Sequence, residues 1–477
     1  MLRRDFGDMP EGRPELIGHH LEHAGEVLGA VEQYVAAARS ARRSAALEEA
    51  AGRYRHSITL IHTLPAGAER DGHEIALQLE LAAVMGLMHA FSAPAVGEVY
   101  MRTVALCEQS GEKGDPYAEA LHGLAQHHLS AARFDDAARV ATVLLDHARE
   151  AGQPHPEVLA HRALSQVRFW TGRYTELWEH SARAMELYDP EAPVEQRFAM
   201  GIESGVIAMT YGAVGLWALG RPHEAAAMAD RCVEHAKRQP DVYQQAYAQA
   251  YLSMLGIMLI DPERVERWAL AAKSIAERHG FAPLEGLSRY TLAWAMAERG
   301  HPESFDMVVS GIGILAALGT GIGAPGCMAV VAEMYAKDGQ FGEAAGYVAF
   351  GEAMADGTGQ HFYTVELHRS AALAHLGLAD AADDDEVRAT ELHAAEQRAS
   401  AAIDLARAQS AASLELRAIQ PMIELLCRRG DTEAARSLLA DAVAKFPAES
   451  SGTELDRARA ALRGAAELRP RLRFHEV

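Results

Sequence analysis

One pattern of apolar residues recurs in five segments and constrains the fold more than any other feature. In each segment apolar residues stand at relative positions 0, 3, 4, 7 and 11, the stripe that faces a core when a helix turns every 3.6 residues. Successive segments begin 88, 40, 40 and 39 residues apart, and a more polar copy inside the longest step begins at Leu177. The five segments begin at Ala137, Ala225, Val265, Phe305 and Ala344.

A short turn stands just before most of these helices. It has a small residue, then a bulky residue or proline, then an acidic residue, as in TGRYTEL, LGRPHEA and DGQFGEA. Glycine can adopt the left-handed conformation that ends one helix, and an acidic residue suits the first turn of the next. A second apolar helix lies upstream of each turn, for example AYAQAYLSMLGIML. The turn glycines are Gly172, Gly220, Gly300, Gly339 and Gly430.

Helix, tight turn and helix thus form a unit of about 40 residues that repeats in series, which is typical of an α-solenoid. Alternation with period two is almost absent, and alanine is a poor strand former, so a β-rich fold is excluded. We predict an all-α fold, a right-handed α-solenoid of tetratricopeptide-like helix-turn-helix repeats. Its expected parts are a lead-in (1–14), repeats (15–378), an acidic insertion or linker (379–397), terminal repeats with a capping helix (398–470) and a tail (471–477).

The turns resemble those of the tetratricopeptide repeat, in which a small residue in the first helix, a Gly-x-aromatic turn and an alanine in the second helix interlock. The period departs by about six residues from the usual 34 of that repeat. The matching residues are Gly172 with Tyr174, Ala132 with Phe134 and Ala137, and Gly339 with Phe341 and Ala344.

A longer resemblance covers nearly all of residues 15–445. The segments PELIGHHLEHAGEVLGAVEQYVAAARSA, ALSQVRFWTGRYTELWEHSARAMELYDP and YGAVGLWALGRPHEAAAMADRCVEHAK are similar to the C-terminal helical-repeat region of large bacterial signalling ATPases. In that family an ATPase module, often with an adenylate/guanylate cyclase or a LuxR-type DNA-binding domain, precedes the repeats. This chain has no G-x-x-x-x-G-K-S/T phosphate loop and no obvious cyclase metal site. The resemblance therefore implies a sensor or interaction arm, either a fragment of a larger regulator or a stand-alone product.

The charge and hydropathy of the chain exclude several classes of partner. The formal net charge of −21 would repel a nucleic-acid backbone, so no direct nucleic-acid ligand is expected. No run of 18 or more apolar residues occurs, and the start lacks the apolar region of a secretory signal. These absences predict a cytoplasmic chain with no membrane partner.

Neither the cysteines nor the histidines form a recognisable metal or redox motif. The four cysteines lie far apart without a C-x-x-C pair, so we expect reduced thiols rather than a zinc site. His19 and His23 are spaced i, i+4, but two ligands do not make a structural metal site, and H-E-x-x-H is absent. We expect no metal and no cofactor.

The repeat geometry nominates a candidate binding surface. In tetratricopeptide-like arrays the first helix of each unit lines the concave face, so aligning the units on their turns selects its exposed positions. Aromatic anchors beside arginine and glutamine suit a peptide-binding groove. Packing of the tryptophans between helices as ordinary core is the alternative. The candidates are Glu119, His122, Gln126, Arg162, Gln166, Trp170, Trp217, Tyr247, Tyr290, Trp294, Glu298, Glu333 and Lys337.

Three hypotheses about function follow. The leading one is a non-enzymatic interaction module that binds a protein or peptide in bacterial signalling or transcriptional regulation, with an ATPase, cyclase or DNA-binding effector as a candidate partner. The second is a small-molecule sensor, which needs an enclosed cavity of roughly 300 to 1,000 Å³. The third is an unrecognised enzyme on a helical-repeat scaffold, although no spacing singles out catalytic groups. A homo-oligomer also stays open, because terminal repeats expose apolar faces unless they are capped.

The stretch GTGIGAPG, residues 319–326, contains the G-x-G-x-x-G pattern of a dinucleotide-binding turn. That fingerprint requires a preceding strand within a βαβ unit, which the sequence does not offer. Gly319 follows the first residue of its stripe by 14 positions, and Gly152 and Gly280 follow theirs by 15. The stretch is therefore predicted to be a joint between repeats.

Overall fold

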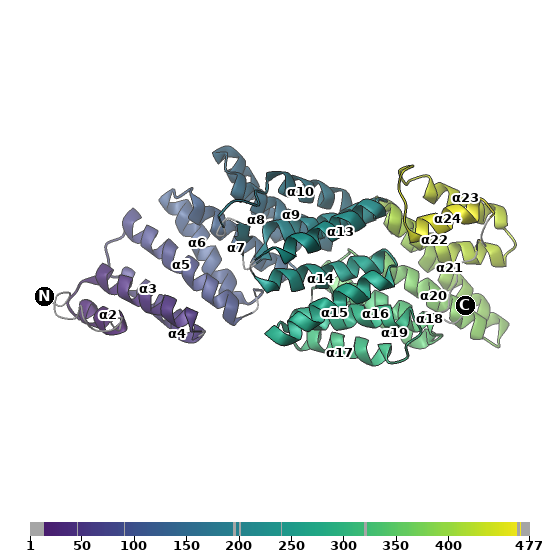
Figure 1. Ribbon diagram of the computed structural model, residues 1–477, viewed down its shortest axis with the longest axis horizontal. Coiled ribbons are helices and arrows are strands. Elements are labelled where there is room, and N and C mark those ends of the chain that lie inside the picture. Colours follow the sequence, from purple (N-terminus) through teal and green to yellow (C-terminus); the bar gives the residue numbers. More distant parts are fainter. Residues whose placement is uncertain are drawn as a thin grey trace. The chain divides into compact units, whose positions relative to one another are not determined.

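The structure is a computed structural model, and it describes all residues except 1–13, 45, 90, 194–196, 200–201, 240, 319–321, 465–467 and 469–477. Nearly all described residues belong to helices that follow one another along the chain (Figure 1). The chain divides into two compact units, residues 1–163 and 164–477, with the boundary inside helix α9 (Pro154–Trp170).

In the first unit each helix from α2 to α7 packs against the next one along the chain. The turn from α8 to α9 passes through Gly152, whose φ of 63° is left-handed. The helices are α2 (Pro14–His23), α3 (Val27–Arg43), α4 (Leu47–Ile61), α5 (Ala68–Met88), α6 (Pro94–Ser110), α7 (Asp115–Ser130), α8 (Phe134–Ala151) and the first part of α9.

The second unit continues in the same way, apart from a hairpin in which the two-residue strands β1 and β2 pair antiparallel. The prediction of an all-α solenoid is thus confirmed. The elements after α9 are α10 (Tyr174–Leu187), β1 (Phe198–Ala199), β2 (Ile202–Glu203), α12 (Ser204–Ala218), α13 (Pro222–Lys237), α14 (Val242–Met258), α15 (Pro262–His279), α16 (Ala282–Ala297), α17 (Ser304–Ala317), α18 (Ala324–Lys337), α19 (Phe341–Thr358), α20 (Thr364–Ala381), α21 (Asp385–Ala408), α22 (Ala412–Arg428), α23 (Thr432–Val443) and α24 (Thr453–Leu462).

The helices of the second unit are of two kinds. The inner helices, which are α12, α14, α16, α18, α20 and α22, pack on one another as well as on their sequence neighbours. Most of their residues are buried, including every described residue of α12 except Met209. The outer helices, which are α13, α15, α17, α19, α21 and α23, bury only one stripe each. This division explains why the inner helices α12 and α14 are apolar almost all round, whereas the outer helices α13 and α15 are amphipathic.

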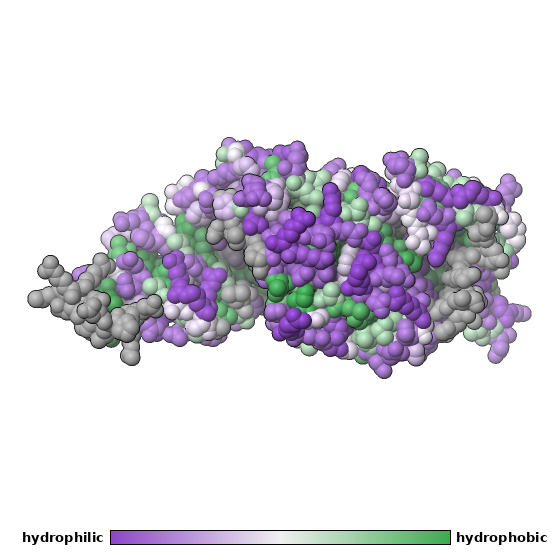
Figure 2. Space-filling model, viewed as in Figure 1, coloured by the Kyte–Doolittle hydropathy of each residue, from purple (hydrophilic) through white to green (hydrophobic). Residues whose placement is uncertain are grey.

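The outer surface is mostly hydrophilic in the view of Figure 2, as the net charge of −21 would suggest. Large hydrophobic side chains exposed on outer helices include Leu270, Val309 and Phe350. Such residues are common on the surfaces of folded proteins and do not by themselves mark an interface.

The predicted stripes of α8, α13 and α15 are buried as a whole. The stripe of α17 is an exception, because Val308 is buried while Val309 is 54% exposed. Here Gly311 faces α16, and a Cβ atom on Gly311 would lie 2.8 Å from the carbonyl oxygen of Gly286. The close approach of the α16 and α17 backbones at these glycines therefore determines which face of α17 is buried. The spacing of the apolar residues of α17 does not determine it.

The predicted turn conformation is confirmed at the five turn glycines. Their φ angles lie between 70° and 82°, which is the left-handed region that glycine enters without steric cost. The acidic segment 379–397, expected to be an insertion or linker, contains the end of α20 and the first part of α21. The side chain of Asp384 caps α21 by accepting hydrogen bonds from the N–H groups of Glu386 and Val387.

The stretch GTGIGAPG falls partly outside the described residues, which resume at Ile322. Its described part connects two helices, α17 and α18, with Gly323 in the left-handed region at φ 89°. The N–H of Gly323 donates to Oε1 of Gln360 at 2.6 Å, and a Cβ atom on Gly326 would overlap the Phe362 ring. These glycines therefore allow close packing at a joint between helices.

We predict opposite effects for two glycine-to-alanine substitutions in neighbouring helices. Gly377→Ala should lower the free energy of unfolding by about 1–3 kcal/mol, because the added Cβ would overlap the ring of Phe341 and overpack the contact between α19 and α20. Gly346→Ala should raise it by about 0.5–1 kcal/mol, because its Cβ would meet no atom and alanine favours the helix. Denaturant unfolding checks both, and shifts in the same direction would contradict the packing described.

Candidate functional site

Two segments that are far apart in sequence meet where α9 turns into α10. The carbonyl oxygen of Trp170 accepts hydrogen bonds from the N–H groups of His361 at 2.8 Å and Phe362 at 3.1 Å. The hydroxyl of Tyr174 donates to the carbonyl oxygen of Phe362, 188 residues away. The rings of Trp170 and Phe362 meet edge to face at 5.1 Å. The second unit therefore folds back on itself, with the α9–α10 turn against the α19–α20 connection.

A second contact of this kind lies at the turn from α12 to α13. The hydroxyl of Ser413 donates to the carbonyl oxygen of Trp217 at 2.5 Å, and that of Ser450 donates to the carbonyl oxygen of Gly220 at 2.8 Å. These donors lie at the start of α22 and between α23 and α24. We call these two the closing contacts. They join the turns after α9 and α12 to the α19–α20 connection, to the start of α22 and to the α23–α24 connection.

The structure places most candidate residues out of contact with solvent. Trp170, Trp217 and Trp294 are 7%, 2% and 3% exposed, so they pack as core and do not line an open groove. His122, Gln126, Arg162, Gln166, Tyr247, Tyr290 and Glu333 are also buried. Glu298 and Lys337 are half-buried, and Glu119 is exposed. The candidates also divide between the two units, and their role in binding stays a prediction.

Two candidate residues from α18 belong to a larger group of charges on the inner helices. Glu333 and Lys337 lie beside charged side chains from four other segments, and each of those side chains is at most 17% exposed. We call the group the inner charge cluster. Its members are Glu298 after α16, Glu333 and Lys337 of α18, Glu366 and Arg369 of α20, Arg417 of α22 and Glu454 of α24.

Ion pairs link these residues into one network. Nζ of Lys337 lies 2.6 Å from a carboxylate oxygen of Glu298 and 3.1 Å from one of Glu333. Nη2 of Arg369 lies 2.7 Å from Oε2 of Glu366 and also forms an ion pair with Glu333. The network thus joins α16, α18 and α20 through charge-assisted bonds, which are stronger than neutral hydrogen bonds.

Arg417 lies at the centre of the cluster, and one terminal nitrogen of its guanidinium has no acceptor among the described residues. Its Nη2 lies 3.3 Å from Oε2 of Glu333, and its Nε lies 3.1 Å from Oε1 of Glu366 and 3.8 Å from Oε1 of Glu454. The side chain is 4% exposed, and Nη1 has no hydrogen-bond partner among the described residues, whereas Nε is paired with Glu366. Leaving a buried donor unsatisfied is costly, so Nη1 of Arg417 is available to bind a further carboxylate.

The cluster shifts the pKa values of its members in opposite directions. Burial opposes ionisation of Glu333, but the charges of Arg369, Lys337 and Arg417 outweigh it and lower the pKa of that carboxyl. Burial raises the pKa of Glu454, and the Arg417 charge only partly offsets this. Glu333 is therefore held as a carboxylate, whereas the ionised form of Glu454 is disfavoured.

Sequence alignment on the turns identified Glu298, Glu333 and Lys337 but missed the rest of the cluster. The signal for Glu366 and Arg369 was present as an acid and a base at i, i+3 in the first part of the alanine- and leucine-rich helix TVELHRSAALAHLGLADA. Arg417 stands similarly in an apolar stretch of α22. Charges on the apolar face of an inner helix were therefore the better indicator of this site.

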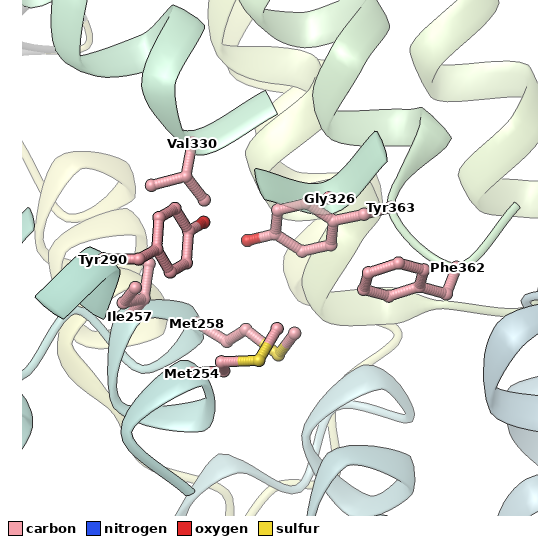
Figure 3. Close-up of a pocket in the computed structure, with 8 residues that line it drawn as sticks. All are labelled: Met254, Ile257, Met258, Tyr290, Gly326, Val330, Phe362 and Tyr363. Atoms are coloured by element: carbon pink, nitrogen blue, oxygen red, sulfur yellow. The ribbon is translucent and has the colours of Figure 1, made fainter. Parts of the chain in front are cut away.

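Two small cavities border the inner helices. The first has a volume of about 10 Å³. The hydroxyl groups of Tyr290 and Tyr363 point toward one another beside it, opposite Met254 and Met258 of α14 (Figure 3). The second, of about 20 Å³, is lined by residues including Trp217, Met258 and Glu454. Each has room for about one water, so neither is the metabolite-sized pocket that the sensor hypothesis needs.

Other features singled out in the sequence have local structural roles. The ring of His23 bonds the carbonyl oxygen of His19 at 3.0 Å. Within the described residues, no three His, Cys, Asp or Glu side chains are grouped so that they could hold a metal ion. Burial raises the pKa values of Cys107 to about 11 and of Cys232 to about 12. None of the helices described is long and apolar enough to cross a membrane.

Comparison with known proteins gives a distant relative and structural likenesses. No protein-family model matches the chain. The uncharacterized protein R02095 of Rhizobium meliloti (strain 1021) is 24% identical over 422 residues, which is 86% of this chain but only 39% of that protein. The chain therefore spans well under half the length of this relative.

The solved structures that resemble this chain are helical-repeat proteins, and the likeness concerns the fold alone. The apo form of RapI is 12% identical with a TM-score of 0.48, covering 60% of this chain and 99% of that one. Aspartyl phosphate phosphatase F from Bacillus subtilis is 11% identical with a TM-score of 0.44, covering 82% and 97%. Yeast Tom70 is 11% identical with a TM-score of 0.35, covering 95% and 94%.

Removal of one buried carboxylate should destabilise the chain far more than removal of an exposed one. Glu333→Gln leaves Arg369, Lys337 and Arg417 without their shared counter-charge, and it should lower the free energy of unfolding by about 3 kcal/mol or more. In the control Asp380→Asn, which breaks the half-exposed pair with Arg428, the change should stay within about 1 kcal/mol. Equal losses in denaturant unfolding would contradict the role given to the cluster.

The lowered pKa of Glu333 also predicts the response to acid. Its ionised form is favoured in the folded state, so its contribution to stability is present above the pKa of an unfolded glutamate, near 4.3, and is lost as the pH falls below it. The melting temperature should begin to drop near about pH 5 and continue to drop as the pH falls further, and the drop should be shallower in Glu333→Gln. Parallel curves for wild type and variant would exclude this origin of acid sensitivity.

Proposed function

We propose that this chain is a non-enzymatic helical-repeat module that binds a protein or peptide partner. The observation that carries the proposal is the inner charge cluster, in which Arg417 is buried and its Nη1 has no acceptor among the described residues. Buried ion pairs stabilise a fold no better than well-packed apolar residues do. Their presence on the inner helices of a solenoid, where such proteins commonly bind partners, supports a role in recognition.

The second hypothesis, a small-molecule sensor, receives less support. Both cavities described above are water-sized, whereas ligand pockets are typically about 300–1,000 Å³. A partner that engages charged side chains on helices needs no preformed cavity of that size.

The finer setting that we propose is bacterial signalling or transcriptional regulation, with an ATPase, cyclase or DNA-binding effector module as the partner. The sequence resemblance to the repeat regions of signalling ATPases supports it. The distant relative is also consistent with it, because this chain matches only 39% of that longer protein and leaves room there for an effector.

Cross-linked affinity purification from the source bacterium tests the proposal. We expect the tagged wild-type chain to capture a partner, and the variant Arg417→Lys, which keeps the charge but loses the guanidinium geometry, to capture it at least ten-fold less. The control variant Arg428→Lys, in the half-exposed pair with Asp380, should capture as much as wild type.

A parallel measurement separates the binding hypothesis from the sensor hypothesis. The melting temperature of the purified chain is recorded with a cell extract divided at about 1 kDa, since drug-sized ligands that fill pockets fall below that mass. Stabilisation by the large fraction alone fits the binding module. Stabilisation by the small fraction alone, with no partner captured, would replace the proposal with the sensor.

A further inference from the structure

The segment between α23 and α24 enters the second unit beside the α12–α13 turn. Ser450 bonds the carbonyl oxygen of Gly220 at 2.8 Å. Gly452 lies so close to Pro222 that a Cβ atom there would be 2.9 Å from Cγ of Pro222. The segment before α24 therefore packs closely against the α12–α13 turn, and this packing places the first turn of α24 next to Arg417.

The first turn of α24 presents a carboxylate followed by an aliphatic side chain. Glu454 faces Arg417, with 3.8 Å between Oε1 and Nε. Leu455 is 2% exposed and lines the cavity of about 20 Å³ together with Trp217 and Leu416. Glu454 thus lies opposite the guanidinium of Arg417, and Leu455 packs in an apolar site beside it.

The fit of this turn is incomplete. A separation of 3.8 Å is too long for a hydrogen bond, and Nη1 of Arg417 has no acceptor among the described residues. Burial disfavours the charged form of Glu454, and a cavity remains beside it. A carboxylate that came within about 2.7–2.9 Å of the guanidinium would form the bidentate pair that arginine favours.

We propose that the first turn of α24 occupies, within the same chain, the site for a partner segment in which an acidic residue is followed by an aliphatic one. The Arg417 guanidinium binds the partner's carboxylate, and the apolar site lined by Trp217 and Leu416 binds the aliphatic side chain. The inference rests on the proposed function as a binding module, and it assigns to that module a site, a ligand chemistry and an internal competitor.

The attachment of α24 allows such an exchange. The helix is 10 residues long and packs chiefly on α23. The ends of α24 and its connection are held by arginine bonds to carbonyl oxygens, from Arg459 to Ser450 at 2.5 Å and from Arg436 to Leu462. An isolated helix of this length is marginal in water, so a segment that fits Arg417 better can displace it.

Fluorescence anisotropy with the full-length chain tests the inference. The probe is a labelled peptide with the sequence SSGTELDRA, which matches residues 450–458. We expect weak binding to wild type and at least ten-fold tighter binding to Glu454→Ala/Leu455→Ala, in which the internal competitor is weakened. The milder variant Glu454→Gln, which keeps Leu455 in place, should give a smaller gain in the same direction. The control Glu433→Ala removes an exposed carboxylate of α23 and should bind as wild type does.

Two further arms identify the site. In the double variant Glu454→Ala/Leu455→Ala, the added substitution Arg417→Lys should weaken peptide binding at least ten-fold. Replacing the peptide's glutamate by glutamine should weaken binding to the double variant by a similar factor. Hydrogen exchange of wild type with saturating peptide should increase in α24 but not in α22. Thermal unfolding establishes that each variant is folded.

The inference fails if wild type and both Glu454 variants bind the peptide equally, or if none binds it. If cross-linking nevertheless captures a partner in an Arg417-dependent way, the module binds partners by another route, and only the competitor role of α24 is overturned. If neither experiment finds binding, the proposed function fails as well.

Discussion

The inner charge cluster exists in its buried form only because the second unit folds back on itself. The carbonyl oxygen of Trp170 is bonded to the backbone of His361 and Phe362, and that of Trp217 is bonded to Ser413. In a solenoid without such contacts the inner helices would line an open groove, where water would solvate their charges. Here those charges meet one another, so the closing contacts determine both which side chains are core and what electrostatic environment the arginines experience.

The closing contacts change how the charged side chains of the inner helices affect stability. Exposed ion pairs contribute little to stability, whereas a buried charge is costly unless each of its donors and acceptors is matched. Glu333 meets this condition through Lys337, Arg369 and Arg417. Arg417 does not, because its Nη1 has no acceptor among the described residues. The difference separates the part of the cluster that holds α16, α18 and α20 together from the part that can recognise a ligand.

Local rules predicted the helices but not the site. The stripes beginning at Ala137, Ala225 and Val265 and the left-handed turn glycines follow from interactions within one repeat, so the sequence contains them. The rotation of α17 depends on contact between Gly311 and Gly286, and periodicity does not encode that contact. The closing contacts join residues that are 188 and 196 positions apart, and a pattern that repeats about every 40 residues does not predict contacts over such separations. The sequence therefore identified the tryptophans as candidate residues, but it did not predict whether they are buried.

The closed conformation also limits how a partner can enter. The second cavity is water-sized, so a segment can reach Arg417 only after α24 or a closing contact has moved. Opening at Trp170 would expose its ring and that of Phe362 to water, and aromatic burial is among the larger contributions to a core. Release of α24 exposes Leu455 and the small side chains of Ala458 and Ala461, uncovers Arg417, and leaves Trp170 in place. Movement of α24 is therefore the less costly route, and it leaves the rest of the second unit intact while the partner binds.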